Sequence, residues 1–312
     1  MVFRALTLTI VLAVAWTETG PVTAEERLAP KPLAVSTLRD FISERLNAHG
    51  QDVQAAVWVG AADGPAWFKQ DAATVMPTAS AIKTFYLVEF FAAYGDRLDS
   101  SLPETNDILG NDHPAVSHFP PAVRGEIRRE LGSASVRRIG EVMMGQTDVS
   151  NAVYNAAANL ITARLGGPQK LTSLIHDRDP RFKTVMVRRY MLRDRTQPGD
   201  NEATTEAFAA LYQALASRTL NGISELVMTA LHEVLQRGSN SSGVLYEKDG
   251  GLSTDPLTSV KAGWRQTGPG PVVFVVMCRQ PTVETARRTA VYDDLRALSL
   301  AIRDRAVKIT GD

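Results

Sequence analysis

The sequence predicts an α+β fold, an α/β sandwich in which one antiparallel five-stranded sheet is flanked by helices. Strand-like runs stand near the start of the chain and return near its end, so both ends should build the sheet. The middle, from Ser80 to about Leu215, is helical wherever it is periodic, which predicts an all-helical subdomain inserted between the strands. A composition of 44% hydrophobic and 22% charged residues in 312 is typical of a soluble globular protein with a sizeable core.

The elements can be assigned in order from their periodicity. Helical spacing over residues 38–47 precedes a strand over 53–59, and a second strand over 66–68 follows the turn Ala-Asp-Gly-Pro. Helical spacing then covers 82–94, 136–144, 150–165, 168–176, 205–217 and 223–236. The remaining elements are strands over 244–247, 257–264 and 271–278 and a helix over 288–307. We expect a site in the cleft between the sheet and the helical insertion.

The first residues predict a signal peptide. One positive charge precedes an apolar run, Ala5 to Trp16, that is too short to span a bilayer. Small residues at Val22 and Ala24 predict cleavage after Ala24 and an exported protein, periplasmic or secreted, with no stable membrane insertion afterwards. A short N-terminal anchor is the alternative. Residues 25–312 would then form one domain, with a sheet subdomain over about 34–79 and 218–312 and a helical subdomain over about 80–217.

Charge and metal-ligand spacing exclude several classes of function. Lysine plus arginine and aspartate plus glutamate both count 34, so no net field draws the chain onto nucleic acid. The five histidines show no metal-binding spacing, and we expect neither a metal nor another cofactor. Cys278 is the only cysteine, which excludes an intramolecular disulfide.

A serine and a lysine open an otherwise apolar helix in PTASAIKTFYLVEFFAAY, residues 77–94. Taken alone, Ser80 is readily explained as a helix cap and Lys83 as a solvated side chain. However, residues i and i+3 share one face of a helix, and a helix this apolar should be buried. Burial would lower the pKa of Lys83 and allow its amine to accept the proton of Ser80. The pattern therefore predicts an activated nucleophile.

Two motifs together resemble the serine β-lactamase and penicillin-binding protein superfamily, and class A β-lactamases most closely. PTASAIKTF resembles its Ser-x-x-Lys element, and NAAANLITARLGGPQKLTSLI, residues 155–175, resembles the segment that begins at the last residue of its Ser-Asp-Asn motif. The resemblance covers roughly residues 38–307 and implies a β-lactamase/transpeptidase-like fold. Asn155 then falls on the substrate-binding asparagine, and Asn159 on a structural asparagine.

The activity implied by the resemblance is that of a serine hydrolase acting on cyclic amide C–N bonds. A β-lactam or related amide or ester would acylate Ser80, with Lys83 as its catalytic partner, and the acyl-enzyme would then be hydrolysed. The implied partner is a small-molecule β-lactam or a peptidoglycan-like substrate, and we expect a monomer.

The third family motif, Lys-Thr-Gly on a sheet strand, has two candidates. Lys248 is followed by Asp249, Gly250 and Gly251, whereas Lys261 is followed by Ala262 and Gly263. In the family two more strands follow this lysine, and only Lys248 leaves room for both; Lys261 is the alternative. The resemblance implies that Lys248, Gly250 and Gly251 bind substrate and that the lysine holds a substrate carboxylate. The N–H groups of Ser80 and Gly251 would form the oxyanion hole.

The sequence also departs from the family at two catalytic positions. Val153 stands where the family has a serine that protonates the leaving nitrogen, and Ser150 or Tyr154 could replace it only with a different loop path. Tyr190 aligns with the glutamate that activates the deacylating water, and Asp194 and Asp200 are the nearby acidic candidates. A non-catalytic or stalled penicillin-binding-like envelope protein is therefore the alternative to a hydrolase.

Overall fold

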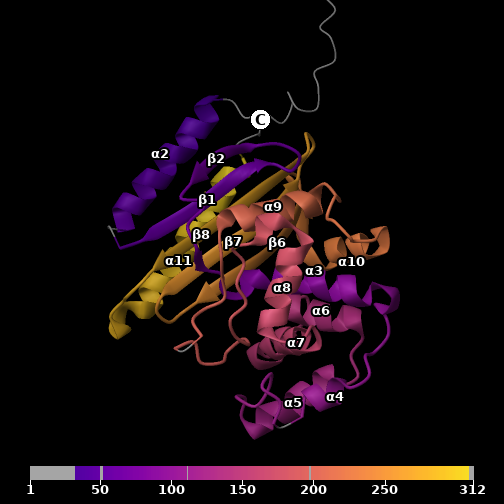
Figure 1. Cartoon of the computed structure of the whole chain (residues 1–312). Helices are drawn as coiled ribbons and strands as arrows, with labels where there is room; N and C mark the ends of the chain where they lie inside the picture. Colours follow the sequence, from indigo (N-terminus) through magenta and orange to yellow (C-terminus); the bar gives the residue numbers. More distant parts are fainter. Residues whose placement is uncertain (1–31, 50–51, 111, 197, 309–312) are drawn as a thin grey trace, which may run out of the picture.

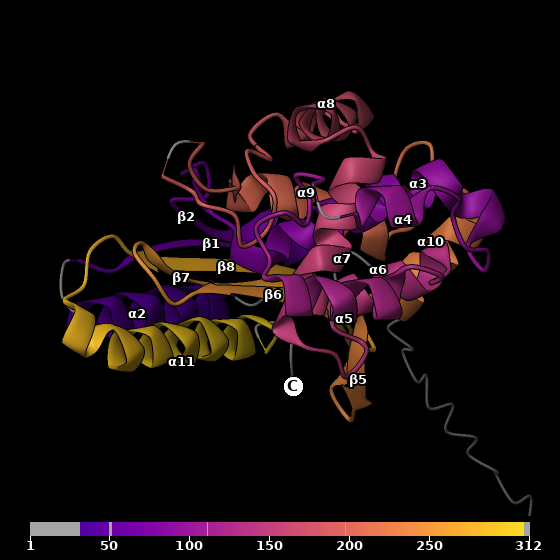
Figure 2. The ribbon, with the colours of Figure 1, turned by 90° about the horizontal axis from the view of Figure 1, so that it is seen from below.

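A computed structural model of the chain describes residues 32–49, 52–110, 112–196 and 198–308, so the predicted signal peptide lies outside the described residues. The described chain forms an α+β sandwich (Figure 1). Figure 2 shows α2 (Pro32–His49) and α11 (Arg288–Ala306) together on one face of the central sheet. The helical middle of the chain covers the other face. The described part contains no helix with the length and apolar character needed to cross a membrane.

The central sheet is antiparallel and has six strands in the order β2-β1-β8-β7-β6-β5. All five predicted strands are present, as β1 (Gln54–Ala61), β2 (Ala66–Gln70), β6 (Gly243–Leu252), β7 (Leu257–Gln266) and β8 (Pro271–Gln280). Because β1 pairs with β8, the two ends of the chain meet at the middle of the sheet. The sheet subdomain is thus assembled from both ends of the chain, as predicted.

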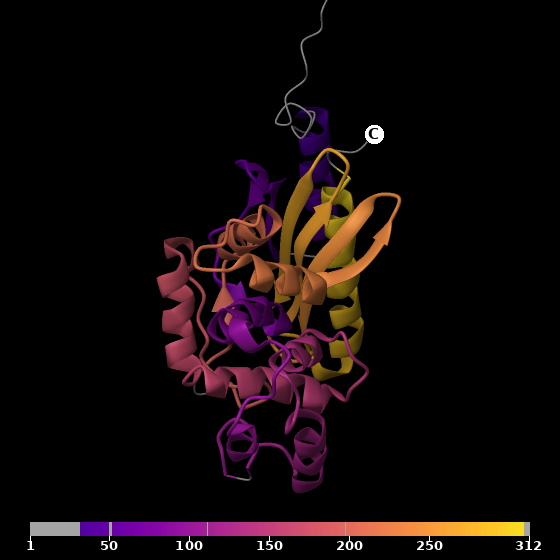
Figure 3. The same ribbon diagram turned by 90° about the vertical axis from the view of Figure 1, so that its right-hand side faces the viewer.

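The sixth strand, β5 (Gln236–Asn240), was not predicted. Its sequence QRGSN is polar and mostly exposed, so it carries none of the alternation that marks a half-buried strand. It pairs with residues 243–246 only, at the start of β6. Figure 3 shows this orange hairpin extending away from the helices that cover the sheet. The rest of β6, which includes the predicted motif from Lys248 to Gly251, is not paired with β5.

The predicted helices are all found, with ends that differ by a few residues at most from the sequence prediction, apart from the first. They are α2, α3 (Lys83–Tyr94), α6 (Val136–Met144), α7 (Asn151–Arg164), α8 (Pro168–Arg178), α9 (Thr205–Ala216), α10 (Glu225–Leu235) and α11. Serine or threonine side chains cap α6, α7, α9 and α10 by accepting a hydrogen bond from a first-turn N–H. These caps explain why these helices begin at well-defined residues.

Several short elements had no clear signal in the sequence. They are α4 (Thr105–Ile108), α5 (Pro121–Leu131), the two-residue strands β3 (Met76–Pro77) and β4 (Glu202–Ala203), and the 3₁₀ turns η1 (Ala79–Ile82), η2 (Gly95–Arg97), η3 (Pro180–Phe182) and η4 (Thr285–Arg287). α4 and α5 lie at the end of the helical part farthest from the sheet (Figure 1). The pairing of β3 with β4 matters more, because it joins the segment before Ser80 to the segment before α9.

The core has two parts, one on each face of the sheet. Along β8, Val273, Val275 and Met277 pack toward the helical part, whereas Phe274 and Cys278 pack toward α2 and α11. This period of two is what a strand buried on both faces requires. Cys278 is a free, buried thiol.

Candidate active site

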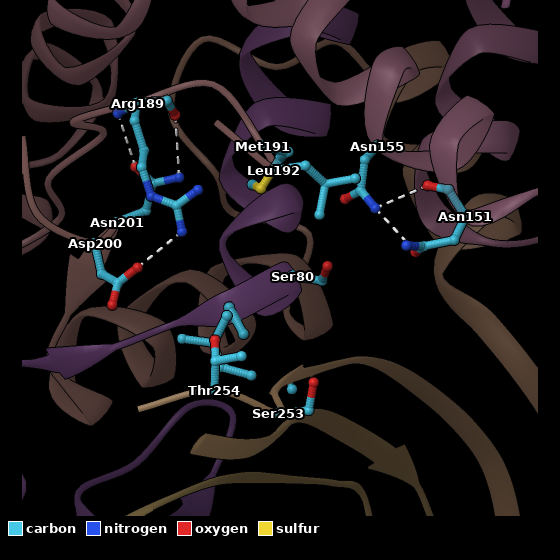
Figure 4. Close-up of a pocket in the computed structure, with 13 residues that line it drawn as sticks. Ser80, Asn151, Asn155, Arg189, Met191, Leu192, Asp200, Asn201, Ser253 and Thr254 are labelled. Atoms are coloured by element: carbon cyan, nitrogen blue, oxygen red, sulfur yellow. Dashed lines mark hydrogen bonds and ion pairs between the residues drawn. The ribbon is translucent and has the colours of Figure 1, made fainter. Parts of the chain in front are cut away.

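Ser80 lies in η1, the single 3₁₀ turn between β3 and the start of α3. It lines a cavity of about 360 Å³ between the helical part and the end of β6 (Figure 4). Asn155 and Asn151 from α7 line the same cavity, as does Gly251 from β6. The structure therefore brings the predicted nucleophile, amide and oxyanion glycine to one cavity.

Lys83 is the first residue of α3 and is fully buried. Its Nζ donates a hydrogen bond to Asn155 Oδ1 at 2.9 Å and lies 3.2 Å from the centroid of the Tyr154 ring. Burial, and to a smaller extent the charge of Lys248, lower the pKa of Lys83 well below its ordinary value. A lysine in this environment can hold a neutral amine, which is the form that accepts a proton.

Asn155 is held in one orientation by a residue that the sequence prediction missed. Its Nδ2 donates to the backbone oxygen of Asn151 at 2.9 Å and to Asn151 Oδ1 at 3.0 Å. Its Oδ1 is therefore left to face Lys83. The i, i+4 spacing of the two asparagines on one helix was the available signal.

The structure places Lys248, and not Lys261, beside Lys83. Lys248 is 4% exposed, and its Nζ lies 5.4 Å from the centroid of the Tyr154 ring. Lys261 lies on β7 opposite Asp249, with its Nζ 3.1 Å from Asp249 Oδ2. The two strands predicted to follow Lys248 are β7 and β8.

The glycines after Lys248 allow β6 to approach the nucleophile closely. A Cβ at Gly250 would lie 2.9 Å from the Ser80 nitrogen and 2.7 Å from the Ala81 nitrogen. A Cβ at Gly251 would collide with the hydroxyl of Tyr292. Gly250 therefore requires glycine for lack of space, because its neighbours are backbone atoms, whereas a side chain at Gly251 would require Tyr292 to move. Ser80 and Gly251, whose N–H groups are the predicted oxyanion donors, line the same cavity.

The serine that should protonate the leaving nitrogen has no direct replacement. Val153 is fully buried in the helical core. Ser150 is the N-cap of α7, and its Oγ accepts a hydrogen bond from the Val153 N–H at 3.3 Å. Tyr154 presents its ring to both lysines, with Lys83 Nζ at 3.2 Å and Lys248 Nζ at 5.4 Å from the ring centroid.

In the segment between α8 and α9, the residue that lines the Ser80 cavity is Met191, which follows the predicted Tyr190. Met191 lines the Ser80 cavity, whereas Tyr190 lines a separate cavity with Pro168 and Asp194. The backbone of Met191 is fixed by Asn159, whose Oδ1 accepts its N–H at 2.5 Å and whose Nδ2 donates to its carbonyl at 3.1 Å. Asn159 thus has the structural role that was expected of it.

Neither acidic candidate in this segment has a free carboxylate directed at Ser80. Asp200 lines the cavity but is paired with Arg189 at 2.8 Å and with Arg195 at 3.3 Å (Figure 4). Asp194 is exposed, and hydrogen bonds from Thr196 lower its pKa. The sequence prediction missed Arg189, Met191 and Leu192, because nothing periodic marks which residues of an irregular segment turn inward.

No metal cluster is found at this site or elsewhere: within the described ranges, no three His, Cys, Asp or Glu side chains are grouped to hold a metal ion. The polar side chains that line the cavity are three hydroxyls, three amides and one paired arginine and aspartate, and the buried Lys83 is hydrogen-bonded to one of the amides, that of Asn155. Such a set is suited to attack on a carbonyl carbon followed by stabilisation of an oxyanion.

The profile of the Beta-lactamase2 family, described as the Beta-lactamase enzyme family, matches residues 37–304. Solved structures similar to this chain include a mutant of the TLA-1 extended-spectrum β-lactamase, with 12% identity, a TM-score of 0.66, and coverage of 88% of this chain and 99% of that one. A β-lactamase from Chitinophaga pinensis has 16% identity and a TM-score of 0.61, with coverage of 85% and 99%. An acyl-enzyme complex of a PBP-A mutant with penicillin G has 18% identity and a TM-score of 0.58, with coverage of 86% and 97%. No curated protein matches the chain.

Proposed function

Because the chain belongs to the β-lactamase enzyme family, we propose that it is a serine hydrolase in which a β-lactam or a related amide or ester acylates Ser80. The observation that carries this proposal is the environment of Lys83. A buried lysine with a lowered pKa, one helical turn from a serine in an open cavity, has little value for stability and a direct use in catalysis.

The positions of the groups support a specific acylation step. The neutral amine of Lys83 takes the proton of Ser80 Oγ as the oxygen attacks the carbonyl carbon of the substrate. The carbonyl oxygen becomes an oxyanion between the N–H groups of Ser80 and Gly251. When the oxyanion collapses, the C–N or C–O bond breaks, the leaving atom takes up a proton, and the acyl group remains on Ser80. Asn155 Oδ1 accepts the hydrogen bond from Lys83 Nζ and so holds the amine in place.

The substrate should carry an apolar group next to its acyl carbon. Met191 and the half-exposed Leu192 form one wall of the cavity. Gly251 and Leu252 at the end of β6 also line the cavity, beside the hydroxyl-bearing Ser253 and Thr254. A β-lactam with an apolar acylamino side chain fits this combination, as does a peptidoglycan-like amide.

Hydrolysis of the acyl-enzyme should be the slow step. Met191 turns into the cavity from the segment where the family carries its deacylating glutamate, and a thioether cannot activate water. This observation favours the second candidate function, a penicillin-binding-like protein that acylates and stalls. The described state of PBP-A with penicillin G, an acyl-enzyme complex, is in keeping with such a product.

We further propose that the protein acts outside the cytoplasm, as a monomer. The support is the apolar run from Ala5 to Trp16 and the small residues before position 25. Peptidoglycan-like substrates and β-lactams are both met in that compartment.

The test is covalent labelling. The protein is incubated with a fluorescent penicillin and analysed by gel fluorescence and intact mass, beside Ser80→Ala and the control Ser253→Ala, a second serine of the same cavity. We expect one adduct on the unmodified protein and on Ser253→Ala, and none on Ser80→Ala. Thermal unfolding of Ser80→Ala should be unchanged, because the Ser80 hydroxyl caps no helix. Undiminished labelling of Ser80→Ala would exclude the proposal.

A further inference from the structure

The side chain of Asp249 lies between Lys248 and Lys261, the two candidates for the lysine of the Lys-Thr-Gly motif. Its Oδ1 is 3.3 Å from the Nζ of Lys248, and its Oδ2 is 3.1 Å from the Nζ of Lys261. One carboxylate thus bridges both ammonium groups. In the motif that this strand resembles, the position after the lysine is a threonine, which carries no charge.

Asp249 lies next to the part of β6 that approaches the nucleophile. It stands two residues before Gly251, which lines the Ser80 cavity, and residues two apart on a strand lie on the same face. In the described structure β5 pairs with residues 243–246 only, so from Glu247 onward the edge of β6 turned away from β7 is left to η1 and the cavity. A substrate that lies along this edge must pass Asp249, whose side chain is 55% exposed.

The charge of Asp249 persists over the whole physiological pH range. Desolvation works against the anion, but the charges of Lys248 and Lys261, together with their hydrogen bonds, lower the pKa of Asp249 to about 2. Two positive charges and one negative charge therefore stand beside the cavity. A carboxylate arriving from solution would have to displace Asp249 from both lysines or lie against a like charge.

We propose that Asp249 is a specificity-determining residue that supplies, from the chain itself, the carboxylate which the Lys248 and Lys261 pair would otherwise take from a substrate. The preferred substrate then has an uncharged or amine-bearing group next to its scissile bond, and carboxylate-bearing β-lactams acylate Ser80 poorly. The predicted effect on catalysis rests on the proposed acylation at Ser80. The predicted effect on binding, weaker binding of carboxylate-bearing ligands, does not depend on acylation.

The first experiment compares benzylpenicillin with its methyl ester, which differ in this one charge. Acylation rates are followed by intact mass for the unmodified protein, Asp249→Asn, Asp249→Thr and the control Asp63→Asn, which removes an exposed carboxylate from the turn between β1 and β2. Removing one charge near the bound carboxylate should raise the ratio of the acid rate to the ester rate on the order of tenfold in both Asp249 variants. The ratio should stay the same in Asp63→Asn. An unchanged ratio in the Asp249 variants overturns the inference.

The second experiment separates this inference from the proposed function. Ser80→Ala and the double variant Ser80→Ala with Asp249→Asn cannot be acylated at Ser80, so binding of the two penicillins is measured by calorimetry. We expect the acid to bind the double variant on the order of tenfold more tightly than Ser80→Ala, and the ester to show no such gain. Equal affinity for the acid, including no binding to either protein, overturns the inference. A lack of adducts on the Ser80 protein counts against the proposed function and leaves this measurement to decide the role of Asp249.

Discussion

The Nζ of Lys83 lies 3.2 Å from the centroid of the Tyr154 ring, with Asn155 Oδ1 accepting one of its hydrogen bonds at 2.9 Å. An aromatic face attracts the charged form of lysine, whereas burial favours the neutral form. The balance between the attraction of the ring and the effect of burial determines the fraction of Lys83 that is neutral at neutral pH. The Tyr154 ring therefore influences the pKa of the proposed base, Lys83, and this effect does not depend on the Tyr154 hydroxyl.

Two variants of Tyr154 separate the effect of its ring on acylation from the effect of its hydroxyl. Tyr154→Phe keeps the aromatic face, so the pH midpoint of acylation should stay where it is. Tyr154→Leu removes an interaction worth about 0.5–2 kcal/mol, so the midpoint should fall by roughly 0.4–1.5 pH units. The measurement is the rate of adduct formation against pH. If Tyr154→Phe instead loses acylation, its hydroxyl is the donor to the leaving nitrogen.

The acylation rate should rise with pH through a midpoint well below 10.5, the ordinary pKa of lysine, because only neutral Lys83 can accept the proton of Ser80. Lys83→Met keeps the apolar stem and removes the amine, so labelling should disappear while the fold is retained. Lys183→Met, at an exposed position in the helical part, is the matched control and should label normally. Labelling of Lys83→Met at the normal rate would mean that another group is the base.

Lys83 should also give the stability of the protein a pH dependence. Between its lowered native pKa and 10.5, the unfolded chain holds a proton on Lys83 that the native protein does not hold. The free energy of unfolding should therefore rise with pH across this window, and Lys83→Met should remove that rise. Denaturant titrations at several pH values check this. An equal slope in both proteins would contradict the lowered pKa.

Lys248 and Lys261 should contribute unequally to acylation of Ser80. Lys248→Ala removes the ammonium group beside Tyr154 and Lys83, whereas Lys261→Ala removes one on the neighbouring strand. We expect Lys248→Ala to slow acylation by a carboxylate-bearing β-lactam much more than Lys261→Ala does. Rates from intact mass give the ranking. The reverse ranking would make Lys261 the motif residue.

Turnover should show a burst of about one equivalent of product followed by a slow steady state, with an adduct visible by mass during the slow phase. Met191→Glu should shorten the lifetime of the adduct, because it places a carboxylate in the Ser80 cavity. Tyr190→Glu is the matched control and should leave the lifetime unchanged, since Tyr190 lines the other cavity. Rapid turnover by the unmodified protein, without a burst, would reveal a base that is not among these residues.

Much of the fold could be predicted because its elements have clear periods. The five strands and the long helices alternate or repeat as buried elements must, and the polar strand β5 was missed because it does not. In the site, Ser80 and Lys83 could be predicted because they stand three residues apart at the start of an apolar helix, and Asn155 because the resemblance to the family motif falls on it. The inward position of Met191 could not, because hydrogen bonds from Asn159, 32 positions earlier, set the register of an irregular segment.

The pairing of β1 with β8 also bears on when the protein becomes active during synthesis. Gln54 and Arg279, which are joined across these strands, lie 225 positions apart in the chain. Ser80, Lys83 and Asn155 are all synthesised before β6, which carries Gly251, and before β7 and β8, which complete the sheet beside β1. Contacts of such long sequence separation form late. Nascent chains truncated before β8 should therefore take up no fluorescent penicillin, and labelling during translation would report the moment at which the sheet closes.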